Sequence, residues 1–317
     1  MPSPRILVFR GGALGDFILT LPALRALRGW WPDSHVELVC RQRAAELAKE
    51  SGLTSGIRSL ESAEWARLFA ESTGLSGEQA GFVRSFDVVV SWLHDPDGTV
   101  RQNLQHAGAR RLICGSPIPD GFHGADQLMR PLESLGIPVD GAAVPALDLS
   151  GARVEQGRKR LRKLGERVVA IHPGSGSPAK NWPLSRFVEL ARTLRTETSL
   201  TPMFTFGEAD ERLAEEFDAT DRSLPALPRC DVTELAGVLA ACAGYIGNDS
   251  GVTHLAAALG IPVVAVFGPT DPDVWGPRGA RVRIVRASER TSAGLAAISV
   301  EEVLHAAEAT VGCILLG

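Results

Sequence analysis

The residues best suited to chemistry in this sequence lie in glycine-rich turns that follow predicted strands. One such turn, GNDSG at residues 247–251, leads into a helix of small residues. Asp249 and Ser250 occupy the position of a helix N-cap. The amides of Ser250, Gly251 and Val252 then stand at the positive end of the helix dipole. The turn predicts a phosphate-binding site, with an ordinary capped strand-to-helix turn as the alternative.

A second turn, GGALGD at residues 11–16, follows the apolar segment RILVFR and begins a helical pattern. Asp16 falls in the first turn of this helix, where a carboxylate can act as a general base or simply be stabilised by the helix dipole. The dinucleotide fingerprint GxGxxG does not fit, because Ala13 and Leu14 stand where glycines are required, so we expect no nicotinamide cofactor. The residues that shape this turn are Arg10, Gly11, Gly12 and Gly15.

A third turn, PGSGSPAK at residues 173–180, places a cation in the same half of the chain as the GNDSG turn. Lys180 can stabilise negative charge on a phosphate, and Ser175 and Ser177 can donate hydrogen bonds to it. A solvated loop lysine is the alternative. Together the three turns favour a sugar nucleotide, with its pyrophosphate on the second half of the chain and an acceptor on the first.

The apolar pattern predicts alternating strands and helices that position these turns. Strands are expected at residues 5–10, 35–40, 57–60, 87–92, 111–114, 168–172, 203–206, 263–267 and 282–285, with a further apolar run at 241–246. Helices are expected at residues 41–50, 124–135, 151–164, 184–194, 208–217, 232–242, 252–259 and 300–309, and in the remaining gaps of the first half. This alternation predicts an α/β fold of two facing, doubly wound Rossmann-like domains, with ligands in the cleft between them.

The domain boundary is expected within residues 136–150, a stretch with Pro and Gly and little helical signal. A length of 317 residues also favours two cores over one. The predicted domains are residues 1–148 and 149–317. The alternative that the last helix packs back on the first domain stays open.

Composition excludes several functional classes. The chain is 44% hydrophobic and 22% charged, and its formal charge of −4 argues against nucleic acid as a partner. No apolar run is long enough to span a membrane, and we expect no signal peptide. The cysteines lack the spacing of a zinc site or a disulfide framework, so they are expected to be reduced, buried thiols. They are Cys40, Cys114, Cys230, Cys242 and Cys313.

Three long stretches of the sequence resemble glycosyltransferase family 9, the ADP-heptose:lipopolysaccharide heptosyltransferases. They are ILVFRGGALGDFILTLPALRAL, IHPGSGSPAKNWPLSRFVELA and GNDSGVTHLAAALGIPVVAVFGPTDPDVWGP, and they occur in the family's order. The resemblance implies a GT-B fold and an inverting, metal-independent transfer of a sugar. It further implies a nucleotide-activated heptose, ADP-heptose, as donor and no bound cofactor.

The resemblance assigns roles to the residues of the turns. Asp16 matches the family's proposed general base, which takes the proton of the acceptor hydroxyl; because a carboxylate is a weak base, it acts late or chiefly orients the acceptor. The turn of Arg10 to Gly15 then lies on the acceptor side. Lys180 matches the lysine that contacts the donor phosphate. The diphosphate-binding turn of the family corresponds to Asp249, Ser250, Gly251 and Val252.

Several further residues carry two open interpretations each. Glu211 resembles the acidic residue that binds the donor ribose, although Glu208 could take that role and either could be plain surface acidity. His254 either reaches the phosphates or makes a packing contact. Trp182 is expected to pack rather than to stack on a base. Arg10 either holds an anionic acceptor or forms a salt bridge.

Two differences from known members of the family bear on the expected metal and acceptor. The cysteine-rich iron-binding motif of the autotransporter-type members is absent, and we expect no metal. The loops at residues 59–85 and 95–105 hold few cations for an anionic glycan. The partners expected are a nucleotide-sugar and a glycan or lipid-linked glycan, with at most peripheral membrane contact, because we identify no strongly basic amphipathic stretch. The expected location is the cytoplasm or the inner face of the membrane.

Two other functions are compatible with the same fold. A sugar-nucleotide epimerase would need more acid and base carboxylates around the sugar than we identify. An inactive sugar-nucleotide-binding protein would not need Asp16 and Lys180 together. We therefore favour the glycosyltransferase.

Overall fold

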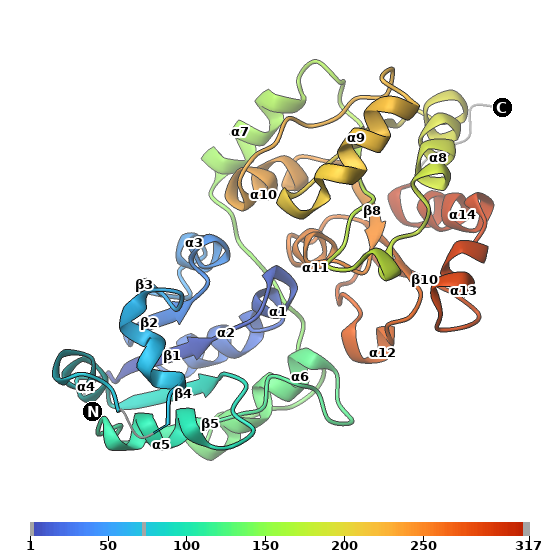
Figure 1. The fold of residues 1–317 in the computed structure, drawn as a ribbon. Coiled ribbons are helices and arrows are strands. Elements are labelled where there is room, and N and C mark those ends of the chain that lie inside the picture. The colour runs from blue at the N-terminus through green and yellow to red at the C-terminus, as the bar shows by residue number, and fades with distance from the viewer. Residues whose placement is uncertain (1–2, 72–73, 313–317) are drawn as a thin grey trace. The chain divides into compact units, whose positions relative to one another are not determined.

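The computed structural model describes residues 3–71 and 74–312, with the side chains of residues 42 and 43 left aside. The chain forms two compact units, Met1–Leu147 and Asp148–Gly317. Each unit holds one five-stranded parallel sheet with helices packed on it (Figure 1).

The N-terminal unit has the strand order β3-β2-β1-β4-β5. Its strands are β1 (Arg5–Arg10), β2 (His35–Cys40), β3 (Gly56–Ser59), β4 (Val88–Trp92) and β5 (Leu112–Cys114). Its helices are α1 (Leu14–Ile18), α2 (Leu21–Trp30), α3 (Gln42–Glu50), α4 (Gly77–Arg84), α5 (Thr99–His106) and α6 (Gly124–Met129), with 3₁₀ segments η1 (Ala63–Phe69) and η2 (Arg130–Leu135). β1 is central and apolar throughout its interior because helices cover both faces of a parallel sheet.

The C-terminal unit has the strand order β10-β9-β8-β6-β7. Its strands are β6 (Val168–His172), β7 (Thr201–Phe204), β8 (Gly244–Asn248), β9 (Val263–Phe267) and β10 (Val282–Arg286). Its helices are α7 (Gly151–Leu161), α8 (Leu184–Glu197), α9 (Glu211–Thr220), α10 (Val232–Ala240), α11 (Gly251–Ala258), α12 (Pro272–Trp275), α13 (Ser292–Ala297) and α14 (Val300–Val311), with 3₁₀ turns η3 (Pro178–Lys180) and η4 (Glu208–Asp210). α14, the last of these, packs on α8 and β9 and belongs to the core of this unit.

Aromatic side chains pack among the aliphatic ones in both cores. In the N-terminal unit, Phe9 of β1 meets Trp65 edge to face, with 5.1 Å between ring centroids. In the C-terminal unit, Phe204 and Phe217 lie 4.4 Å apart, and Trp182 contacts Phe187 at 4.8 Å. These buried rings anchor the strands whose carboxyl ends carry the candidate site.

Each sheet changes direction at one point, where successive crossovers go to opposite sides. In the N-terminal unit this topological switch point lies between β1 and β4, and in the C-terminal unit between β6 and β8. Ligands of open α/β sheets bind beyond the carboxyl ends of the strands at such points. The turns after β1, β6 and β8 are the three glycine-rich turns of the sequence.

The predicted α/β fold of two parallel sheets is confirmed, and the differences are local. β7 begins at Thr201 rather than 203, because Pro202 is tolerated where the strand lies at the sheet edge. The helix expected at 124–135 is an α-helix followed by a 3₁₀ segment, since Pro131 cannot donate its amide to the helix. The short helices α12 and α13 were not predicted.

The cysteines and the hydrophobic helices complete the fold. Cys40 and Cys242 are buried, but Cys114 and Cys230 are only half-buried, so the expectation of buried thiols is wrong for these two. Cys313 lies outside the described residues. Within residues 3–71 and 74–312, no helix is long and apolar enough to cross a membrane.

Candidate functional site

The turn after β1 fixes the position of the Asp16 carboxylate. Gly12 has φ of +93°, and a Cβ added to it would lie 2.6 Å from the Cβ of Asp16. Only glycine suits this position, because of both the left-handed backbone and the lack of space. The Asp16 carboxylate accepts a hydrogen bond of 2.9 Å from the Ala13 amide. The Asp16 side chain remains 35% exposed. One carboxylate oxygen is thus held by the turn while the group stays accessible to a ligand.

Arg10 is the buried partner of this turn. Its side chain is 3% exposed, and its Nη2 lies 3.7 Å from Oδ1 of Asp16 and 3.0 Å from the Asp16 carbonyl oxygen. Its Nε donates to Thr20 Oγ1 at 2.8 Å. Burial lowers the pKa of Arg10 from its ordinary value, and the charge of Asp16 opposes this. Of the two roles that the sequence left open for Arg10, the salt bridge is present in the structure.

In the C-terminal unit, α11 begins at the predicted turn. Ser250 is its N-cap, and its Oγ accepts the amide of Thr253 at 3.3 Å. The first amides of an α-helix, here those of Gly251 and Val252, have no acceptor inside the helix. The buried Thr253 hydroxyl stabilises the turn by a hydrogen bond of 2.9 Å with the Tyr245 hydroxyl of β8. This end of α11 offers the amides and the dipole that an anion requires.

Lys180 and the α11 turn are joined by an ion pair. Nζ of Lys180 lies 2.8 Å from Oδ2 of Asp249. The Asp249 side chain is 8% exposed, whereas that of Lys180 is 36% exposed. Lys180 comes from the turn after β6 and Asp249 from the turn after β8, so the pair bridges the topological switch point of this sheet. The pair holds an ammonium group next to the amide end of α11.

Asn248 connects the same two turns through its side-chain amide. Its Oδ1 accepts the Trp182 amide at 3.0 Å, and its Nδ2 donates to the Pro173 carbonyl at 2.8 Å. Asn248 is fully buried. The sequence placed Asn248 in the turn but gave it no role, since nothing local to residues 247–251 indicates a bond to residues 173 and 182.

The loop after β6 is shaped by its own serine and by a buried acid. The Ser175 hydroxyl lies 2.6 Å from Asn181 Oδ1 and 2.7 Å from the Ser177 carbonyl oxygen, so it orders the loop. A Cβ added to Gly174 would lie 2.1 Å from Oδ1 of Asp210. Asp210 is buried and accepts the Gly207 amide at 2.7 Å. The loop therefore depends on a glycine packed directly against a carboxylate.

His172 ends β6 beneath this loop. Its Nδ1 lies 2.9 Å from the Thr205 carbonyl oxygen, and its Nε2 lies 3.7 Å from Oδ2 of Asp210. Burial lowers the pKa of His172 from its ordinary value, although the charge of Asp210 acts in the opposite direction. The sequence gave no signal for this pair, because its members are far apart along the chain.

The remaining predicted residues differ in their surroundings. Glu211 is 74% exposed at the start of α9 and pairs with Arg229 at 3.0 Å, while Glu208 is exposed in the turn just before it. His254 is buried in α11. Trp182 is 1% exposed and its indole N–H donates to the Ile298 carbonyl at 3.0 Å, which confirms the predicted packing role.

Metal ligation has no evident place among these groups. In the described part of the chain, no cluster of three or more His, Cys, Asp or Glu side chains is arranged to hold a metal ion. Beside the amide end of α11 the structure places the ammonium of Lys180, paired with Asp249.

Two Rossmann-like units of this kind define the GT-B class of glycosyltransferase folds, and solved structures of that class match the chain along its length. A family 9 glycosyltransferase structure from Veillonella parvula has a TM-score of 0.81 at 23% identity, covering 98% of both chains. The Escherichia coli heptosyltransferase WaaC, solved with ADP, has a TM-score of 0.72 at 19% identity, covering 96% of this chain and 99% of that one.

The sequence comparisons identify the family. Residues 130–305 match the model of glycosyltransferase family 9 (heptosyltransferase). The lipopolysaccharide heptosyltransferase 1 of Salmonella typhimurium is 36% identical over 335 residues, covering 95% of this chain and 100% of the relative. The chain belongs to glycosyltransferase family 9, and the predicted family is confirmed.

Other relatives match over a shorter stretch. The lipooligosaccharide heptosyltransferase 2 of Haemophilus influenzae is 29% identical over 157 residues, which are 46% of this chain. The match spans 45% of that relative's length.

Proposed function

We propose that this protein transfers heptose from ADP-heptose to a hydroxyl group of a lipopolysaccharide-core acceptor, with inversion and without a metal ion. The support is its family, its full-length similarity to a lipopolysaccharide heptosyltransferase 1, and its fold in common with a heptosyltransferase solved with ADP. In this proposal residues 1–148 bind the acceptor and residues 149–317 bind the nucleotide-sugar.

The observation that carries the proposal is the ion pair between Lys180 and Asp249 at the amide end of α11. A diphosphate seated on the amides of Gly251 and Val252 would meet the ammonium of Lys180 from the neighbouring turn. Negative charge grows on the diphosphate as the bond to the sugar breaks, and a cation fixed there stabilises that charge most in the transition state. Lysine thus supplies the charge that a metal ion supplies in other transferases.

Two further contacts complete the proposed donor site. Ser177, in the loop that Ser175 orders, is close in sequence to Lys180 and is proposed to donate to phosphate. The ribose hydroxyls are proposed to bind Glu211, with Glu208 as the alternative, because exposed carboxylates can accept paired hydroxyls. His254 is proposed to support the helix end from inside rather than to touch the ligand, because its side chain is buried.

Asp16 is the proposed base. The acceptor hydroxyl oxygen attacks the anomeric carbon from the face opposite to the diphosphate, and its proton passes to the Asp16 carboxylate. The new carbon–oxygen bond forms as the old one breaks, ADP departs, and the anomeric configuration inverts. The exposure of the Asp16 carboxylate and its fixed second oxygen suit this role.

The reaction requires both units to act on one pair of substrates, because base and leaving-group residues belong to different units. The acceptor end of the reaction is therefore proposed for the turn of residues 10–16. We place the reaction in the cytoplasm or at the inner face of the membrane, where a lipid-linked acceptor would be presented.

A thermal-shift titration tests the donor. The chain is titrated with ADP, GDP, UDP and dTDP in the absence of metal, and the Lys180→Met variant is titrated beside it. Nucleotide at 100 times its Kd adds about 2.7 kcal/mol of stability, so the shift is readily measured. We expect ADP to stabilise the protein most and the variant to lose most of that shift. A preference for another nucleotide would replace the proposed donor, and no shift with any would favour an inactive relative of the family.

A further inference from the structure

One segment of the C-terminal unit is strongly positive although the chain as a whole is negative. Residues 151–167, which cover α7 and the turn after it, hold seven Lys or Arg against two Glu, a net charge of +5 in a chain of net charge −4. Two of the four lysines of the chain, Lys159 and Lys163, lie here. This excess of positive charge lies outside the turn of Lys180, the proposed phosphate-binding turn.

The packing of α7 decides which of these cations are exposed. A Cβ added to Gly157 would lie 1.9 Å from the carbonyl oxygen of Gly237, so α7 and α10 touch backbone to backbone at this crossing. Leu161 is buried on the same side. The long polar side chains are consequently excluded from the crossing and lie beside it or on the outer side of α7.

Three cations on this outer side have no partner in the described structure. Lys159, Arg162 and Lys163 are exposed, and among residues 3–71 and 74–312 their side chains make no hydrogen bond or ion pair. By contrast, Arg158 lies 3.7 Å from Glu155 and so is partly neutralised. The unpaired cations keep their full charge for an external anion.

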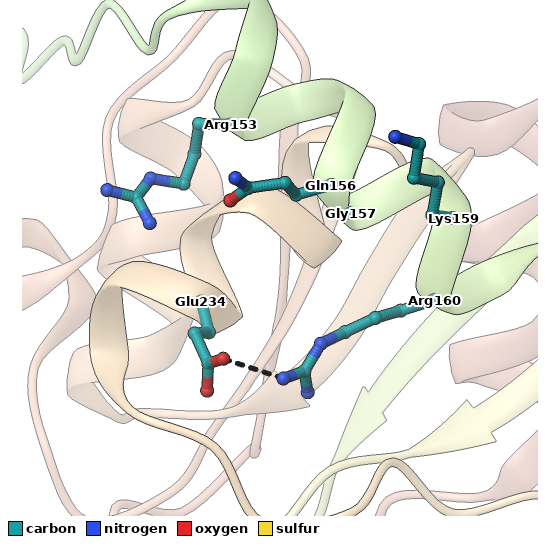
Figure 2. A pocket seen from close by; sticks show the side chains of 6 residues that line it. All are labelled: Arg153, Gln156, Gly157, Lys159, Arg160 and Glu234. Carbon is teal, nitrogen blue, oxygen red and sulfur yellow. Dashed lines mark hydrogen bonds and ion pairs between the residues drawn. The ribbon is translucent and has the colours of Figure 1, made fainter.

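A pocket of about 250 Å³ opens beside the crossing. Figure 2 shows Arg160 reaching from α7 to Glu234 of α10, with 2.7 Å between Nη2 and Oε1. The pocket is lined by Arg153, Gln156, Gly157, Lys159, Arg160 and Glu234. Arg160 is paired with Glu234, so the lining group that remains for a phosphate is the exposed ammonium of Lys159, with the amide of Gln156 nearby.

We propose that this basic face, consisting of Lys159, Arg162, Lys163 and the pocket beside them, binds the phosphate headgroups of an anionic phospholipid bilayer. The pocket takes one headgroup and the three unpaired cations lie on neighbouring ones. Each cation near an anionic surface strengthens binding by about fivefold at low salt. The negative charge of the remaining chain is repelled by the same surface, so this face is turned to the bilayer.

This proposal reverses one expectation from the sequence, in which no strongly basic amphipathic stretch was identified. From the sequence, residues 151–164 are expected only to form a helix. The structure adds that the side of α7 with Gly157 and Leu161 packs against α10, whereas the opposite side carries the unpaired cations. The inference does not depend on the proposed glycosyl transfer.

Vesicle co-sedimentation of the full chain tests the basic face. Vesicles of phosphatidylcholine alone are compared with vesicles that also contain phosphatidylglycerol, at low and at high salt. We expect binding only to the anionic vesicles, weakening as salt rises. The variant K159Q/R162Q/K163Q is expected to bind about 100-fold more weakly. Its matched control, R67Q/R212Q/R283Q, loses the same charge from three scattered exposed positions and is expected to bind like the parent chain.

Three results would overturn the proposal. They are no binding of the parent chain to anionic vesicles, equal loss in both triple variants, and a loss of RNA binding in the first variant with vesicle binding unchanged. The first result, together with saturable binding of glycerol phosphate, would identify a site for free phosphate compounds, and the third a site for nucleic acid. Both variants should keep the parent's thermal shift with ADP, which separates this test from that of the donor site.

Discussion

Two neighbours, the Ala13 amide and Arg10, fix the position of the Asp16 carboxylate. The Ala13 amide fixes one carboxylate oxygen and leaves the group exposed. Nη2 of Arg10 lies 3.7 Å from the other carboxylate oxygen, so both oxygens have a neighbour that fixes their position. Because a carboxylate is a weak base, we expect Asp16 to contribute through orientation of the acceptor and late proton transfer.

Replacement of Asp16 by asparagine keeps the shape of the side chain and removes the base. We expect kcat to fall by about 10²–10⁴-fold with little change in the thermal shift produced by ADP. Release of ADP in the presence of acceptor measures the effect. Asp33→Asn, at an exposed position on a surface turn, is the matched control and should leave the rate unchanged. Equal rates for Asp16→Asn and the parent chain would remove Asp16 from the mechanism.

Lys180 is expected to matter for both binding and rate. Lys180→Met removes the charge beside the amide end of α11 and leaves Asp249 buried without its partner. We expect kcat to fall by about 10²–10³-fold and the affinity for ADP to weaken, because the lost charge acts on the leaving group. The control is Lys49→Met, which changes an exposed lysine of the other unit. Steady-state kinetics that show a change in KM alone would argue for simple phosphate binding.

A residue's role could be predicted from the sequence when its contacts lie within a few positions along the chain, and could not when its partners are far away in the sequence. Ser250 could be predicted as an N-cap because capping involves residues only three positions apart. Asp16 and Lys180 were singled out through glycine turns and a family resemblance, and their site roles stay predictions. Asn248 and Asp210 could not be found in this way, since their partners at residues 173, 182 and 174 are brought near only by the sheet.

At the scale of elements, the loop between β6 and α8 depends on Gly174. Alanine there would place a Cβ 2.1 Å from Oδ1 of Asp210, and that carboxylate cannot move without losing the Gly207 amide. We expect Gly174→Ala to lower the free energy of unfolding by about 1–3 kcal/mol. Gly176→Ala, two residues on and facing open space, should change it by less than about 0.5 kcal/mol. Urea unfolding of the two variants is the measurement.

The carboxyl end of β6 should make stability depend on pH through His172. Burial lowers its pKa in the folded state, so as pH falls the unfolded chain takes up the proton first. The resulting stability is present above about pH 6.5 and is lost as pH falls through the lowered pKa of the folded state. We expect the urea midpoint of His172→Gln to fall less than that of the parent chain between about pH 7.5 and pH 5.5.

The matched control for this pH dependence is His106→Gln, at an exposed position at the end of α5. It should retain the pH dependence of the parent chain. If His172→Gln shows the same loss of stability on acidification as the parent chain, His172 does not govern stability in that pH range.

The bounds of a strand could be predicted where the strand is buried in the sheet and its apolar run ends at a polar turn. β1, β2, β6 and β9 have the predicted bounds because buried parallel strands are continuously apolar and end at polar turns. β8 extends to Asn248, beyond the apolar run, because Asn248 pairs with Val266 in the ladder. α12 and α13 were missed since helices of four and six residues are too short to show an apolar period.

At the scale of the molecule, two sheets repeat one arrangement with different chemistry. Each sheet has a switch point with a glycine-rich turn beyond it, one carrying a carboxylate and the other a cation beside helix amides. A displacement reaction needs one group to take a proton and another to stabilise the leaving group. The division of these two tasks between two units is the central feature of the proposed function.

Product analysis after incubation with ADP-heptose tests that claim most directly. The full chain is incubated with ADP-heptose and heptose-free lipopolysaccharide, and the acceptor is analysed by mass spectrometry while released ADP is measured. We predict that the acceptor gains one heptosyl residue for each ADP released, and that Asp16→Asn slows both signals together by about 10²–10⁴-fold. An acceptor left unmodified by a chain that binds ADP and is stabilised by it would contradict the proposed transfer and indicate a nucleotide-sugar-binding protein instead.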